Sequence, residues 1–134
     1  MQKIAFLLLL LNFIISCNNK SDFKKPENAL EAGREFIDQS LKGHFNTAKK
    51  YMLLDDENLY WLNKVSTDYN KLSEQDKTGL SQSSININEV ADITDSVTVI
   101  NYSNSYKKRS QKVKVVKRKG EWVVDFKYTF SGNL

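Results

Sequence analysis

Fold class follows from one stretch near the C-terminus, Val113-Lys114-Val115-Val116-Lys117-Arg118-Lys119-Gly120-Glu121-Trp122-Val123-Val124-Asp125. Apolar and polar residues alternate on both sides of the central Lys-Gly-Glu, which is the pattern of two half-buried strands joined by a turn. The alternation continues beyond the stretch, so that Trp122, Phe126 and Tyr128 share one face. The stretch therefore predicts an antiparallel hairpin with an apolar face.

Two further strands are expected before this hairpin. Ile85 and Ile87 alternate with asparagines, and residues 97–102 form a run rich in β-branched residues. Turn-forming residues separate the runs, around 92–95 and 105–110. The second half of the chain thus predicts four consecutive antiparallel strands.

The preceding part of the chain has a helical period instead. Pro26 suits the first turn of a helix and Gly43 its end, and apolar residues recur between them every three or four positions. A second apolar stripe covers 45–52, Asp55 is a good N-cap for a third helix, and one more short turn is expected near Leu80. Helices followed by strands predict an α+β domain, with N-terminal helices packed on a curled four-stranded antiparallel sheet.

The N-terminus has the order of a secretory signal. Lys3 precedes an apolar run from Ile4 to Ile15, and the small residue Ser16 comes directly before Cys17, the only cysteine. The run is too short for a membrane-spanning helix, which needs about 20 apolar residues. Its end resembles the lipobox of bacterial lipoproteins, which implies cleavage before Cys17 and acylation of Cys17.

This resemblance divides the chain into a signal peptide (1–16), a lipidated N-terminus with a tether (17–25) and a single domain (26–134). It implies a lipid-anchored protein of the cell envelope. Asn18 is not the aspartate that retains some lipoproteins in the inner membrane, so the outer membrane is favoured. The alternative is an ordinary signal peptide with a chance cysteine at its boundary.

The element order resembles the cystatin-like, or nuclear-transport-factor-2-like, superfamily, and in particular small bacterial lipoproteins that carry a domain of unknown function with that fold. Residues 42–51 and 113–125 carry the resemblance. It implies a cone-shaped domain and no particular chemistry. Enzymes of this fold use polar side chains inside the cone, and the candidates here are Tyr102, Asp125 and Tyr128.

These candidates do not complete a catalytic pair. Alternation places Asp125 opposite Trp122, so Asp125 is expected to face water while Trp122 packs under the helices. Tyr128 and Trp122 are the candidates to face a pocket, and a tyrosine without a base is not a mechanism. His44 is the only histidine, and Cys17 is assigned to lipid. We therefore predict no catalytic residue, no metal site and no cofactor.

One segment concentrates positive charge. The formal net charge is +4, yet residues 107–119 contain eight basic residues and no acidic one. Such a segment suits an anionic lipid, an anionic glycan or an envelope protein, whereas nucleic acid is not expected for an exported chain. The alternative is a solvated strand that is protected from edge pairing. The eight candidates are Lys107, Lys108, Arg109, Lys112, Lys114, Lys117, Arg118 and Lys119.

The sequence therefore predicts a membrane-anchored extracytoplasmic lipoprotein whose domain is an accessory or binding module and not an enzyme. The alternative is a small-molecule-binding or hydrolytic protein that uses the cone. A polar-lined pocket around Tyr128 would favour the alternative, and a filled cone would favour the accessory role. Ligand, partner and oligomeric state stay open.

Overall fold

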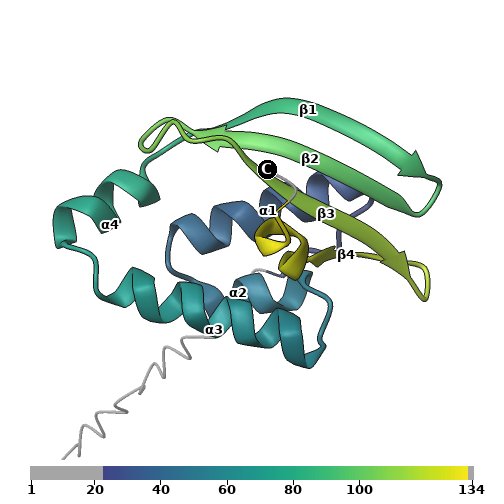
Figure 1. The fold of residues 1–134 in the computed structure, drawn as a ribbon, viewed down its shortest axis with the longest axis horizontal. Helices are drawn as coiled ribbons and strands as arrows, with labels where there is room; N and C mark the ends of the chain where they lie inside the picture. Colours follow the sequence, from purple (N-terminus) through teal and green to yellow (C-terminus); the bar gives the residue numbers. More distant parts are fainter. Residues whose placement is uncertain (1–22, 133–134) are drawn as a thin grey trace, which may run out of the picture.

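The computed structural model describes residues 23–132, so Cys17 and the predicted signal lie outside the described part. Helices come first and a four-stranded antiparallel sheet follows in the order β1-β2-β3-β4, which confirms the predicted α+β class (Figure 1). The elements are α1 (Ala29–Leu41), α2 (Phe45–Ala48), the 3-10 helix η1 (Lys49–Tyr51), α3 (Asp56–Asn70), α4 (Glu74–Ser81), β1 (Ile85–Thr94), β2 (Val97–Asn104), β3 (Gln111–Arg118), β4 (Glu121–Asp125) and the 3-10 helix η2 (Phe126–Phe130).

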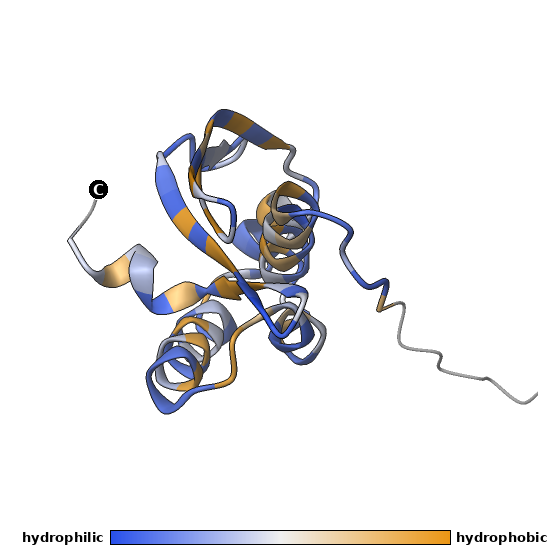
Figure 2. Cartoon of the chain, turned by 90° about the vertical axis from the view of Figure 1, so that its right-hand side faces the viewer, coloured by the Kyte–Doolittle hydropathy of each residue, from blue (hydrophilic) through white to orange (hydrophobic). Residues whose placement is uncertain are grey.

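Helix α1 lies inside the curve of the sheet (Figure 2). Asn28 begins the helix by accepting a hydrogen bond from the backbone N–H of Glu31 at 2.8 Å. Gly33 faces the sheet, and a Cβ at this position would lie 2.5 Å from Cδ1 of Ile100. The missing side chain therefore lets the helix backbone approach the strands closely, while Phe36 is buried one turn further along.

The sheet presents one continuous apolar face to α1. Ile100 of β2 pairs with Val113 of β3, and Val115 of β3 pairs with Val124 of β4. All four side chains are fully buried, as the predicted alternation requires. The core cluster lies wholly between Ala29 and Phe126, so a chain that begins after Cys17 retains every residue that builds it.

The end of β4 differs from the prediction. The alternation up to Tyr128 predicts a strand, but β4 ends at Asp125 and η2 follows. Phe126 leaves the sheet and packs edge-on against Phe36 at 4.8 Å and against Phe130 at 5.1 Å between ring centroids. Aromatic packing against α1 outweighs continued strand pairing. Strand β1 also differs, because it runs to Thr94 through the predicted turn.

Two tryptophans lie at the edge of the core. Trp122 is half-buried and packs against the core cluster beside the start of α1, so it is less enclosed than predicted. Trp61 of α3 stacks on Phe130 at 4.0 Å, while its neighbour Tyr60 is 60% exposed. Trp61 therefore packs against the core while Tyr60 lies at the surface.

Phe36→Ala should lower the free energy of unfolding by about 3–5 kcal/mol, because it empties a fully enclosed aromatic site. Trp122→Ala should cost about half as much, because part of that ring already contacts water. Urea denaturation of both variants checks the order. An equal or larger loss for Trp122→Ala would show that the tryptophan, and not Phe36, lies at the centre of the core.

Candidate functional site

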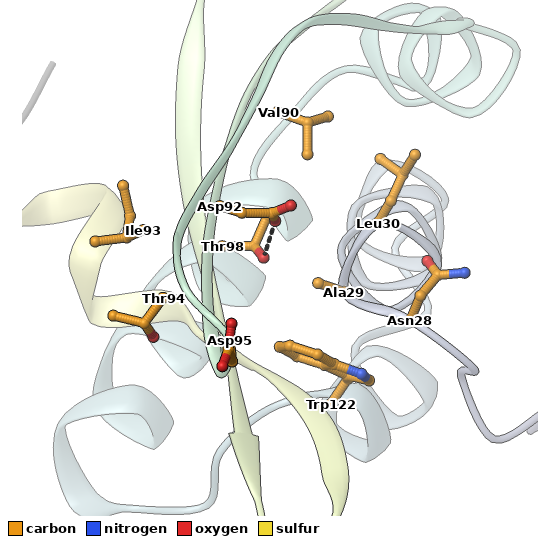
Figure 3. A pocket seen from close by; sticks show the side chains of 10 residues that line it. All are labelled: Asn28, Ala29, Leu30, Val90, Asp92, Ile93, Thr94, Asp95, Thr98 and Trp122. Carbon is orange, nitrogen blue, oxygen red and sulfur yellow. Dashed lines mark hydrogen bonds between the residues drawn. The ribbon is translucent and has the colours of Figure 1, made fainter.

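A broad hollow of about 660 Å³ opens where α1 begins and the sheet curves away from it. Figure 3 shows the Trp122 ring at one end, between Asp95 of the β1–β2 turn and Asn28 at the start of α1. Val90 and Leu30 lie at the other end. The hollow therefore joins an aromatic face, apolar side chains and carboxylates.

Some polar groups of this broad hollow already have internal partners. Asp92 accepts a hydrogen bond of 2.7 Å from the buried hydroxyl of Thr98. The ammonium of Lys117 lies 5.5 Å from the centroid of the Trp122 ring. The Lys117 ammonium and the carboxylates of Asp92 and Asp95 therefore lie at the same surface. This surface favours neither an anionic nor a cationic ligand.

A second hollow, of about 280 Å³, lies between the helices and the sheet. It is predominantly apolar, and we call it the apolar hollow. Its walls come from α1, α2, α3, α4 and η2, and the ends of β2 and β3 close it. The lining residues are Phe36, Ile37, Ser40, Leu41, Phe45, Val65, Asp68, Tyr69, Leu72, Leu80, Tyr102, Gln111, Phe126, Thr129 and Phe130.

Tyr102 and Gln111 form a polar pair in the apolar hollow. They are direct partners across β2 and β3, and the Tyr102 hydroxyl donates a 3.0 Å hydrogen bond to Oε1 of Gln111. Burial raises the pKa of the Tyr102 hydroxyl far above its usual range, because the anion would lose its hydration. Tyr102 is therefore neutral and cannot serve as a general base. The amide nitrogen of Gln111 has no hydrogen-bond partner within residues 23–132.

The carboxylate of Asp125 is buried at 5% exposure, so the expectation that it faces water is wrong. It contacts Nζ of Lys114 at 2.8 Å and Nζ of Lys127 at 2.9 Å, and it accepts a 3.1 Å hydrogen bond from Nδ2 of Asn58. Asn58 in turn accepts a hydrogen bond from the Lys127 backbone N–H at 2.8 Å. Helix α3 therefore covers the side of the strand that alternation assigns to solvent.

Asp55 extends this cluster, which we call the Asp125 cluster. Burial by itself raises the pKa of the Asp125 carboxyl, but hydrogen bonds and charge from Lys114, Lys127 and Asn58 outweigh it and hold the pKa below its usual range. The Lys127 ammonium, 2.8 Å away, likewise lowers the pKa of Asp55, and the same contact raises the pKa of Lys127. The cluster is thus a set of ionised groups that stabilise one another.

The two predicted pocket residues have different positions. Trp122 lines the broad hollow, whereas Tyr128 lines neither hollow and has the Lys114 ammonium 5.3 Å from its ring centroid. The space between the sheet and the helices is therefore not filled, because the apolar hollow lies there. A polar-lined pocket around Tyr128 is not found among residues 23–132, because Tyr128 lines neither hollow. The apolar hollow was missed because its residues come from seven separate elements.

The structure does not bring the eight basic candidates together. Lys107 pairs with Asp76 at 3.5 Å near α4, and Lys114 pairs with Asp125 in the middle of β3. Lys108 and Lys119 lie in the turns before and after β3, with positive φ values of 57° and 50°. Exposed side chains are those of Lys107, Lys108, Arg109, Lys117, Arg118 and Lys119, while Lys112 is half-buried.

No protein family model, no curated protein and no solved structure matches this chain. Within residues 23–132, the helices fall short of the length and apolar character needed to cross a bilayer. The same residues contain no group of three or more histidine, cysteine, aspartate or glutamate side chains placed to hold a metal ion.

Asp125→Asn should lower stability at pH 7 by about 2–4 kcal/mol, because it leaves two lysines without their shared carboxylate. A carboxyl whose folded-state pKa is lowered contributes stability above its unfolded pKa of about 3.9 and loses it as the pH falls further. The difference in unfolding free energy between wild type and variant should therefore shrink as the pH falls below about 4. Asp95→Asn, at an exposed turn, is the control. A constant gap across this range would contradict the ionised cluster.

Proposed function

We propose that this chain is a lipid-anchored protein of the cell envelope whose domain binds a small apolar molecule without catalysing a reaction. The apolar hollow is the observation that supports binding. The lipobox-like sequence ending at Cys17 supports the anchor. Together they describe a binding module that is kept at a membrane surface.

Size and lining of the apolar hollow define the class of ligand. About 280 Å³ is slightly below the roughly 300–1,000 Å³ of typical ligand sites, so the hollow suits a small ligand. The Gln111 amide can donate to one oxygen of a ligand, and the surrounding side chains of Val65, Leu72 and Leu80 are aliphatic. A short alkyl chain with one oxygen-bearing end, such as a medium-chain fatty acid, fits this combination.

Binding is favoured over hydrolysis because the nearby acids and bases are committed elsewhere. Asp68 is the one carboxylate that lines the apolar hollow, and it pairs with Lys64 at 2.9 Å. Tyr102 is held neutral by burial. Asp125 is enclosed by its lysines and does not line the hollow. A hydrolytic mechanism needs a free base beside the substrate, which this lining does not supply.

Octanoate should bind the purified chain of residues 18–134. Burying about six methylenes at about 0.8 kcal/mol each gives about 5 kcal/mol, which corresponds to a Kd of about 0.1–1 mM. Val65→Phe should weaken this binding at least tenfold by occupying the hollow. Val90→Phe, at the broad hollow, is the matched control and should bind as wild type does. Isothermal titration calorimetry measures all three.

The titration would contradict the proposal if Val65→Phe, with an unchanged thermal unfolding midpoint, bound octanoate as wild type does. Absence of binding to the wild-type chain across a series of alkyl acids, alcohols and amines would do the same. Loss of binding in Val90→Phe alone would move the site to the broad hollow beside Trp122.

Cys17→Ser should abolish acylation, because it removes the thiol that would carry the lipid. Metabolic labelling of cells with a palmitate analogue, followed by membrane fractionation, checks this expectation. Wild type should carry label and sediment with membranes, and the variant should carry none. Equal label in both proteins would exclude the lipid anchor.

A further inference from the structure

We infer that the domain faces the bilayer with the surface around η1, and that Lys49 and Lys50 on this surface contact anionic lipid headgroups. The η1 surface consists of the exposed side chains of Phe23, Lys49, Lys50 and Leu54. Phe23 contacts the ring of Tyr51, and the other three lie within three residues of it in the chain. The inference rests on the Cys17 anchor of the proposed function.

The path of the chain indicates which surface lies closest to the anchor. Phe23 is the first described residue, and its ring centroid lies 5.0 Å from that of Tyr51. The backbone N–H of Lys24 donates a 3.3 Å hydrogen bond to the Tyr51 hydroxyl, and Tyr51 itself is buried at 1% exposure. The N-terminal segment is therefore seated on a fixed side chain of η1. Five residues lie between Cys17 and Phe23, so a lipid on Cys17 is attached within about 20 Å along the chain.

The chemistry of the η1 surface fits an anionic bilayer. Lys49 and Lys50 are exposed and form no ion pair within residues 23–132. Leu54 is 63% exposed and Phe23 is 42% exposed, which places apolar side chains beside these cations. Cations next to exposed apolar groups are typical of surfaces that lie in the headgroup region. Two carboxylates lie near Tyr51, those of Glu31 and Glu35, and Glu31 pairs with Lys24 at 2.9 Å.

The basic segment 107–119 is the competing surface, because it contains more positive charge. Its β2–β3 end lies beside α4, where Tyr106 donates a hydrogen bond to Asp76 (Figure 1). The eight residues of β3 separate this end from the β3–β4 turn by about 26 Å. Charge alone favours the segment 107–119, whereas the position of the tether favours the η1 surface. The two hypotheses therefore predict different orientations.

Orientation is measured on the lipidated protein with a fluorescent label. The Cys17 thiol is blocked by lipid, so Lys50→Cys and Arg109→Cys each offer one reactive thiol. Both labelled proteins are reconstituted into phosphatidylethanolamine vesicles with about 30% phosphatidylglycerol and a headgroup quencher. We expect at least threefold stronger quenching of the label at position 50. Equal quenching at both positions, or stronger quenching at position 109, would overturn the inference.

The electrostatic contact is measured on residues 18–134 without lipid, so this result does not depend on the anchor. Sedimentation with the same vesicles at low salt should show about fivefold to tenfold weaker binding for Lys49→Gln with Lys50→Gln. Arg109→Gln with Lys112→Gln removes the same charge from the competing segment and should bind as wild type does. High salt should abolish the difference. The role of the η1 surface would be overturned if binding weakened only in Arg109→Gln with Lys112→Gln, or in neither double variant. Failure of the lipid anchor would leave this sedimentation result unchanged and would be detected by the palmitate labelling.

Discussion

A buried carboxylate joins the helical and the sheet parts of this domain. Asp125 ends β4 and binds Lys114 of β3, Lys127 of η2 and Asn58 of α3, three elements that are otherwise separate in the chain. Burial of an unpaired charge is costly, so these partners are required once the strand ends there. The contacts place α3 against η2 and direct Phe126 toward α1. The wall of the apolar hollow that α3 provides therefore depends on this cluster.

The opposite wall of the apolar hollow is packed less firmly. Helix α4 has no buried residue, yet Leu80 contributes to the lining. Gly79 lies against Tyr106, where a Cβ would come within 2.3 Å of the ring. The ring thus holds α4 by a close flat contact and by its hydrogen bond to Asp76. Regions with little buried apolar surface open at low free energy. Helix α4 is accordingly the least firmly packed wall of the apolar hollow.

Local sequence signals were sufficient for the fold class and for several caps. Asp55 caps α3 by accepting the Asn58 backbone N–H at 2.8 Å, and Gly43 follows the end of α1 with a positive φ of 74°. The end of β4 was mispredicted because Phe126 packs against Phe36, ninety residues earlier in the chain. The local alternation of apolar and polar residues cannot indicate a contact over that distance. The burial of Asp125 and the lining of the apolar hollow could not be predicted for the same reason. The partners of Asp125 and the walls of the hollow come from elements that are distant in the chain.

We propose that ligand binds in the apolar hollow, whose α3 wall depends on the Asp125 cluster. Amide chemical-shift mapping of ¹⁵N-labelled residues 18–134 during a titration with octanoate tests it most directly. We expect saturable shifts that centre on Val65, Tyr102 and Gln111, with little change at Val90 or Asp95. Shifts that centre on the broad hollow beside Trp122, or shifts that spread evenly without saturation, would contradict it.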